Sequence, residues 1–83
     1  MRFDVALHEL RLLKSRSQAA AAIQDGAALL NGAVVKPSHG VRPGDRITLA
    51  GPGGARTLEV LALPARSVSK DAAKALVREI GGG

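Results

Sequence analysis

The polar segment Lys14-Ser15-Arg16-Ser17-Gln18 separates two stretches with helical patterning, and it constrains the fold more than any other feature. Ser15 is a favoured N-cap residue, and Gln18 three residues later completes a capping-box pattern. We therefore expect a second helix to begin directly after Ser15. Together with Arg11, the segment places three cations within six residues. Cations beside an exposed helix N-terminus favour a phosphate there, because free N–H groups and the positive end of the helix dipole also attract anions.

Two N-terminal helices are predicted. The apolar residues Phe3, Leu7, Leu10 and Leu13 recur at helical spacing and predict a helix over residues 4–13, with Asp4 as its cap. The second helix is expected over residues 16–25, where a run of alanines is followed by Gly26 as a left-handed stop.

The middle of the chain predicts strands joined by turns. Asn31-Gly32 between two apolar runs over 28–35 indicates a hairpin with a type I′ turn, and Pro43-Gly44 fits a type II turn. Further strands are expected over 46–49 and 57–63, with a loop over 51–55.

A C-terminal helix is expected over residues 70–80, capped by Ser69. Within it, Lys70, Lys74 and Arg78 would form a basic stripe, because they are spaced four residues apart. Residues 81–83 are all glycine and are expected to form a flexible tail.

These elements predict one α+β domain over residues 1–80. We expect two packed N-terminal helices on a small, mostly antiparallel sheet of three to four strands, followed by a C-terminal helix. The core motif would cover about 2–49, and the strand and helix extension would cover 57–80.

Composition argues against catalysis. The chain of 83 residues has no cysteine and two histidines, so we expect no disulfide, no metal site and no cofactor. No Ser-His pair suggests a triad, and Gly51-Pro-Gly-Gly54 lacks the lysine and helix of a phosphate-binding loop. We expect a non-enzymatic protein. Charges near the N-terminus and the lack of a long apolar run predict a cytoplasmic protein with no membrane partner.

Charge indicates a polyanionic partner. The net charge is +5, from 12 basic and 7 acidic residues. Phe3 is the only aromatic residue and is expected in the core, so platforms for stacking single-stranded bases look absent. The second helix offers alanines beyond Gln18, so it has little with which to read bases. Structured RNA, which is recognised by shape and phosphates, fits better.

The motifs also occur in the order of a known module. They are Arg2-Phe3-Asp4, Lys14-Ser15-Arg16-Ser17, Gly26, Asn31-Gly32, Val35-Lys36-Pro37-Ser38 and Pro43-Gly44-Asp45. Over residues 2–49 the chain resembles the S-four-type RNA-binding domain, named after a small-subunit ribosomal protein. The resemblance implies the fold called the alpha-L motif and binding to structured RNA.

The rest of the chain, with its strand over 57–63 and its alanine-rich helix, resembles small stand-alone members of this family. These are the heat-shock-protein-fifteen family and related ribosome quality-control factors. The resemblance implies binding to ribosomal RNA, and possible contact with transfer RNA, on a large subunit obstructed by peptidyl-tRNA. We expect the protein to be a monomer.

The resemblance implies an RNA-binding face in two parts. The helical part comprises Arg2, Arg11, Lys14, Ser15, Arg16, Ser17 and Gln18. The hairpin part comprises Asn31, Lys36, His39 and Arg42, although the turn alone explains Asn31 and a plain loop position explains His39. Arg46, Arg56 and Arg66 are candidate rim contacts.

Two other functions stay open. The basic stripe on the C-terminal helix would suit an acidic protein, which would make the chain a protein-interaction adaptor. The chain could also be a detached RNA-targeting domain of an RNA-modifying enzyme, such as a pseudouridine synthase or a methyltransferase.

Overall fold

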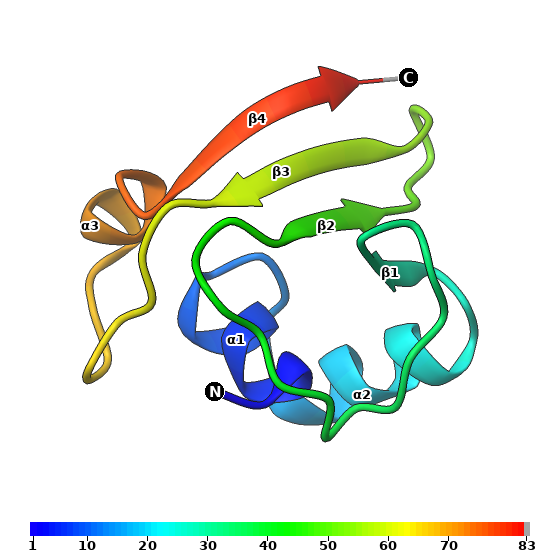
Figure 1. Cartoon of the computed structure of the whole chain (residues 1–83), viewed down its shortest axis with the longest axis horizontal. Coiled ribbons are helices and arrows are strands. Elements are labelled where there is room, and N and C mark those ends of the chain that lie inside the picture. Colours follow the sequence, from blue (N-terminus) through cyan, green and yellow to red (C-terminus); the bar gives the residue numbers. More distant parts are fainter. Residues whose placement is uncertain (83) are drawn as a thin grey trace.

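Two short helices pack on one face of a four-stranded antiparallel sheet in the computed structural model, which describes residues 1–82 (Figure 1). The elements follow in the order α1 (Phe3–Glu9), α2 (Arg16–Gln24), β1 (Ala28–Leu30), β2 (Arg46–Leu49), β3 (Arg56–Val60), α3 (Lys70–Lys74) and β4 (Val77–Gly82). The strands lie side by side in chain order, and α3 lies at one end of the sheet. This arrangement confirms the predicted α+β class. Within residues 1–82, no helix has both the length and the apolar character that a membrane span requires.

Apolar side chains from the helices and the sheet form one core. Phe3 and Leu7 of α1, Ile23 of α2 and Ile47 of β2 are fully buried. Burial alternates along β2 and β3, so the inward positions are apolar, and outward positions such as Thr48 are polar and partly exposed. One-sided burial is typical of an antiparallel sheet with a solvated outer face. The predicted core position of Phe3 is confirmed.

The second helix has the predicted ends. Ser15 has extended backbone dihedrals, and its Oγ accepts a hydrogen bond from the backbone N–H of Gln18 at 3.1 Å. This bond satisfies one of the free donors in the first turn of α2. After the helix, Gly26 has a φ of +78°, which is the expected left-handed stop.

The first helix ends at Glu9 instead of continuing to residue 13. The backbone N–H groups of Arg11 and Leu12 bond to the carbonyl groups of His8 and Leu7, each at 3.0 Å. These two bonds form a Schellman motif, in which the residue after the C-cap adopts the left-handed conformation. That residue is Arg11, with a φ of +60°.

Both predicted turns are present. Asn31 and Gly32 have φ values of +52° and +78°, as a type I′ turn requires. Gly44 has a φ of +96°, and the N–H of Asp45 bonds to the carbonyl of Arg42 at 3.1 Å, as in a type II turn.

The second arm of the predicted hairpin is not a strand. Ala33 forms a single bridge to Leu30, and the chain then leaves the sheet. β2 lies beside β1 instead, with Leu30 opposite Ile47. The chain leaves because the next segment is bonded elsewhere: the carbonyl of His39 accepts the N–H of Phe3 at 2.8 Å.

β3 ends at Val60, earlier than the predicted residue 63. The N–H groups of Leu61 and Ala62 both bond to the carbonyl of Leu76, at 2.8 and 3.2 Å, so the chain bends out of the sheet. The side chain of Leu61 is consequently exposed.

The C-terminal helix is confirmed only in its first part. Ser69 caps α3 as predicted, accepting the N–H of Ala72 at 3.2 Å. Residues 77–80, which were expected to be helical, belong to β4. Sheet pairing overrides the helical spacing there, because β3 would otherwise be an unpaired edge and the β-branched Val77 and Ile80 favour a strand.

The change from helix to strand has two further consequences. Arg78 leaves the predicted basic stripe and pairs across the strands with Glu59 at 2.6 Å, so that stripe does not form. β4 includes Gly81 and Gly82, which were expected in a flexible tail, while Gly83 lies outside the described residues.

Candidate nucleic-acid interface

The corner between α1 and α2 presents cations beside a helix N-terminus. The side chains of Lys14 and Arg16 flank Ser15 and are exposed. Ser17 and Gln18, in the first turn of α2, are exposed as well. Backbone N–H groups, the helix dipole and the two side-chain charges all attract an anion to this point. The corner is therefore suited to hold a phosphate of RNA.

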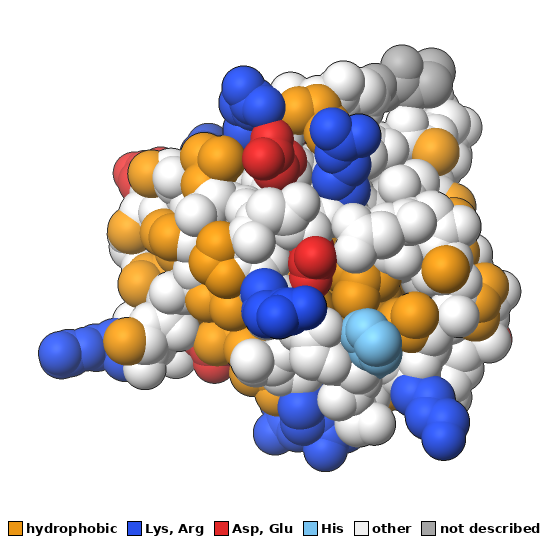
Figure 2. Space-filling view, viewed as in Figure 1, with side chains coloured by type: hydrophobic (Ala, Val, Ile, Leu, Met, Phe, Trp, Pro, Cys, Tyr) orange, Lys and Arg blue, Asp and Glu red, His pale blue; other side chains and the backbone are white. Residues whose placement is uncertain are grey.

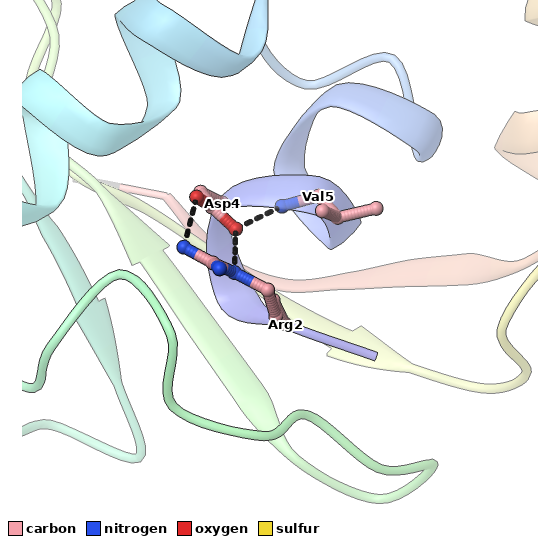
Figure 3. A network of polar contacts seen from close by, with 3 residues as sticks. All are labelled: Arg2, Asp4 and Val5. Carbon is pink, nitrogen blue, oxygen red and sulfur yellow. Dashed lines mark hydrogen bonds and ion pairs between the residues drawn. The ribbon is translucent and has the colours of Figure 1, made fainter.

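Arg2 is bonded to Asp4 (Figure 3). Its Nε and Nη2 donate to Oδ1 and Oδ2 of Asp4 at 3.1 and 3.0 Å, and the N–H of Val5 donates to Oδ1 at 2.7 Å. Asp4 is only 5% exposed, so these bonds satisfy a buried carboxylate. The N-cap position belongs to Arg2, so the expected capping role of Asp4 is wrong. The side chain of Arg2 is 53% exposed and stays partly accessible to a ligand.

Arg11 ties the helix corner to the C-terminal part of the chain. Its Nε and Nη2 both donate to the carbonyl of Val68, at 3.1 and 2.8 Å. A second bond runs from Ser67 Oγ to Glu9 Oε2 at 3.2 Å. Arg11 thus lies at the predicted site, and its exposed guanidinium is hydrogen-bonded to the backbone of the same chain.

Asn31 holds its turn against β2. Its Oδ1 accepts the N–H of Arg46 at 2.9 Å, and its Nδ2 donates to Asp45 Oδ1 at 3.2 Å. The other oxygen of Asp45 accepts the N–H of Arg42 at 2.9 Å. These bonds give Asn31 a structural role, so our proposal for RNA contacts does not depend on it.

Lys36, His39 and Arg42 lie on the connection between β1 and β2, and all three side chains are exposed. This connection runs against the start of α1, where the carbonyl of Pro37 accepts the N–H of Asp4 at 3.1 Å. The helix corner lies at the other end of α1. Because α1 has seven residues, its two ends are about 10 Å apart. Figure 2 shows Lys and Arg side chains along the lower edge of the molecule, where Figure 1 places the helices and this connection.

Lys70 joins the corner from a distant part of the sequence. It lines a shallow depression of about 440 Å³ together with Arg11 and Lys14. The sequence placed Lys70 in a separate basic stripe, since no spacing pattern relates residues 14 and 70. Only the fold reveals that they share a surface.

The described residues offer no metal centre. Within residues 1–82, no group of three or more His, Cys, Asp or Glu side chains could hold a metal ion. The two histidines lie on different elements, His8 in α1 and His39 in the connection that follows β1.

The family model of the S4 domain matches residues 1–47, which is more than half of the chain. The chain belongs to the S4 domain family. The match includes the helix corner and the Asn31-Gly32 turn, on which the resemblance rested. Membership in this family of non-catalytic RNA-binding domains supports RNA binding as the general function.

Two solved structures are similar over the whole domain. Heat shock protein 15 of Vibrio cholerae, solved as a trimer, has 30% identity and a TM-score of 0.89 over 96% of this chain and 81% of its own. A hypothetical protein, HP1423, solved in solution, has 30% identity and a TM-score of 0.80 over 100% of both chains. The first likeness confirms the resemblance to small stand-alone members of the family. A search of curated proteins found no significant match.

Replacing Arg2 with alanine should destabilise the fold, because it leaves the buried carboxylate of Asp4 with only the Val5 N–H. We expect the free energy of unfolding, measured by urea denaturation, to fall by about 1–2 kcal/mol. The exposed Arg66 provides the control, since Arg66→Ala should change stability by less than about 0.5 kcal/mol. Equal effects of the two substitutions would contradict a structural role for the Arg2–Asp4 pair.

Proposed function

We propose that this protein binds structured RNA without catalysing a reaction, and that its target is ribosomal RNA on a large subunit that carries peptidyl-tRNA. One observation carries the proposal: the capped N-terminus of α2 lies between exposed Lys14 and Arg16. This site falls inside the segment that matches the S4 domain. The ribosomal target rests on the likeness to heat shock protein 15.

The mechanism is electrostatic. Lys14 and Arg16 hold phosphates at the start of α2, where Ser15, Ser17 and Gln18 add polar groups. Arg2 contacts the backbone through the exposed part of its guanidinium. Lys36, His39 and Arg42 contact RNA that continues along α1 toward the β1–β2 connection. With about five phosphate contacts, the log–log dependence of affinity on salt has a slope of about −4, using the duplex coefficient.

The adaptor hypothesis loses its main support. It required Lys70, Lys74 and Arg78 on one face of a long helix, whereas α3 ends at Lys74 and Arg78 pairs with Glu59.

We infer a cytoplasmic protein that acts as a monomer. The alternative is a trimer like that of the Vibrio cholerae protein. Light scattering of the purified chain gives its molar mass and so distinguishes a monomer from a trimer.

The double variant Lys14→Ala/Arg16→Ala should bind a fluorescein-labelled RNA stem-loop at least about tenfold more weakly, because two phosphate contacts are lost. Circular dichroism should show an unchanged fold, since both side chains are exposed. The control is Arg78→Gln, which removes one charge from the outer face of the sheet at a residue outside the proposed site. Wild-type affinity in a folded Lys14/Arg16 variant would refute the site.

The ribosomal target is tested by sedimentation with purified large subunits, either empty or carrying peptidyl-tRNA. We expect the wild-type protein to co-sediment with the peptidyl-tRNA complex and the Lys14→Ala/Arg16→Ala variant to stay at the top of the gradient. Binding to the RNA stem-loop but to neither form of the subunit would remove the ribosome from the proposal and leave RNA binding intact.

A further inference from the structure

Two adjoining depressions run from the helix corner onto the C-terminal part of the chain. The first is lined by Arg11, Lys14 and Lys70, with Leu12 and Leu13 beside them. The second, of about 160 Å³, continues past Arg11 and Lys70 toward Arg56, Lys74 and the start of β4 at Val77. Since both share Arg11, Leu12 and Lys70, we treat them as one surface and call it the C-terminal groove.

The charge of the C-terminal groove has a single sign. Its basic lining residues are Arg11, Lys14, Arg56, Lys70 and Lys74, and no Asp or Glu lines either depression. Arg56 bonds to Glu79 at 3.0 Å, so its charge is partly balanced. The other four cations have no carboxylate within salt-bridge distance among the described residues. Lining residues of one sign concentrate a positive potential, which attracts a polyanion.

Three hydrogen bonds join the two walls of the groove, and Arg11 donates two of them. One wall is the loop after α1, and the other is the segment before α3 with Lys70 at the start of that helix. Arg11 donates two hydrogen bonds to Val68, 57 residues away in sequence, and Ser67 bonds to Glu9 beside it. Arg11 is the left-handed residue of the Schellman motif that ends α1, so its backbone is held in place by that motif.

From this geometry we infer that the C-terminal groove is a second part of the RNA site, in which Lys70 and Lys74 bind backbone phosphates of the strand held at the start of α2. Arg11 acts as a positioning residue that places Lys70 beside Lys14. The inference rests on the proposed function. It also goes beyond the family match, which ends at residue 47 and assigns nothing to α3.

The groove is tested with Lys70→Gln/Lys74→Gln. Both side chains are exposed, so the fold should be retained. We expect affinity for the fluorescein-labelled RNA stem-loop to fall about tenfold, and the log–log salt slope to become shallower by about two, as for two lost phosphate contacts. The control Arg78→Gln removes one charge from the outer face of the sheet and should leave both quantities near the wild-type values.

The outcomes separate this inference from the proposed function. If wild-type protein fails to bind the RNA, the proposed function itself is wrong. If Lys14→Ala/Arg16→Ala weakens binding but Lys70→Gln/Lys74→Gln changes neither affinity nor salt slope, the RNA site is confined to the helix corner and the groove is refuted. A loss at least half as large in the Arg78→Gln control, which removes half the charge, would also refute it, because the effect would then come from net charge alone.

Arg11→Lys tests the positioning role, because lysine keeps the charge but cannot make the two-donor contact with Val68. Hydrogen exchange should become faster for the amides of residues 69–76, and RNA affinity should fall severalfold because Lys70 is no longer held beside Lys14. Unchanged exchange together with unchanged affinity would show that Arg11 does not position Lys70. A lower affinity at unchanged exchange would show that Arg11 contacts RNA directly, which contradicts its assignment.

Discussion

The contact of α1 and α2 with the inner face of the sheet is the interaction on which the rest of the structure depends. Phe3, Leu7, Ile23 and Ile47 are fully buried in it, and each contributes roughly 1.5–3 kcal/mol by leaving water. Other core positions are alanines, such as Ala6 of α1 and Ala19 of α2, and these small side chains let the two helices pack closely on each other. The core is small and almost entirely apolar. The other polar residues therefore lie at its periphery, where they are available for binding.

Polar contacts at this periphery then fix the elements that the core does not reach. Arg2 pairs with Asp4 at the start of α1, and the Asn31 side chain bonds its turn to the first residue of β2. Arg11 bonds to Val68 in the segment before α3. Two of these residues are also arginines of the basic surface. The guanidinium groups of Arg2 and Arg11 thus add positive charge to the site and also bond to the chain around it. Removing either arginine would change both the charge and the local structure of the site.

Local signals in the sequence predicted the helix corner, both turns and strand β2, because capping and turn residues act over a few positions. The C-terminal helix was overpredicted because its apolar residues Ala73, Leu76, Val77 and Ile80 have helical spacing. In the structure Val77 pairs with Val60 in the sheet instead. Such pairing depends on contacts between distant segments. The same limit applies to the site: Lys14 and Arg16 were found from a local motif, but Lys70 lies beside Lys14 only through contacts between distant segments, such as the bond from Arg11 to Val68.

The central claim is that one surface, from the start of α2 to α3, binds RNA. Amide chemical shifts of isotope-labelled protein, followed by NMR during titration with the RNA stem-loop, test it most directly. We predict saturable shifts in residues 11–18 and 68–75, with little change in the outer face of the sheet around Thr48 and Glu59. Shifts confined to that outer face, or restricted to residues 11–18 alone, would contradict the claim.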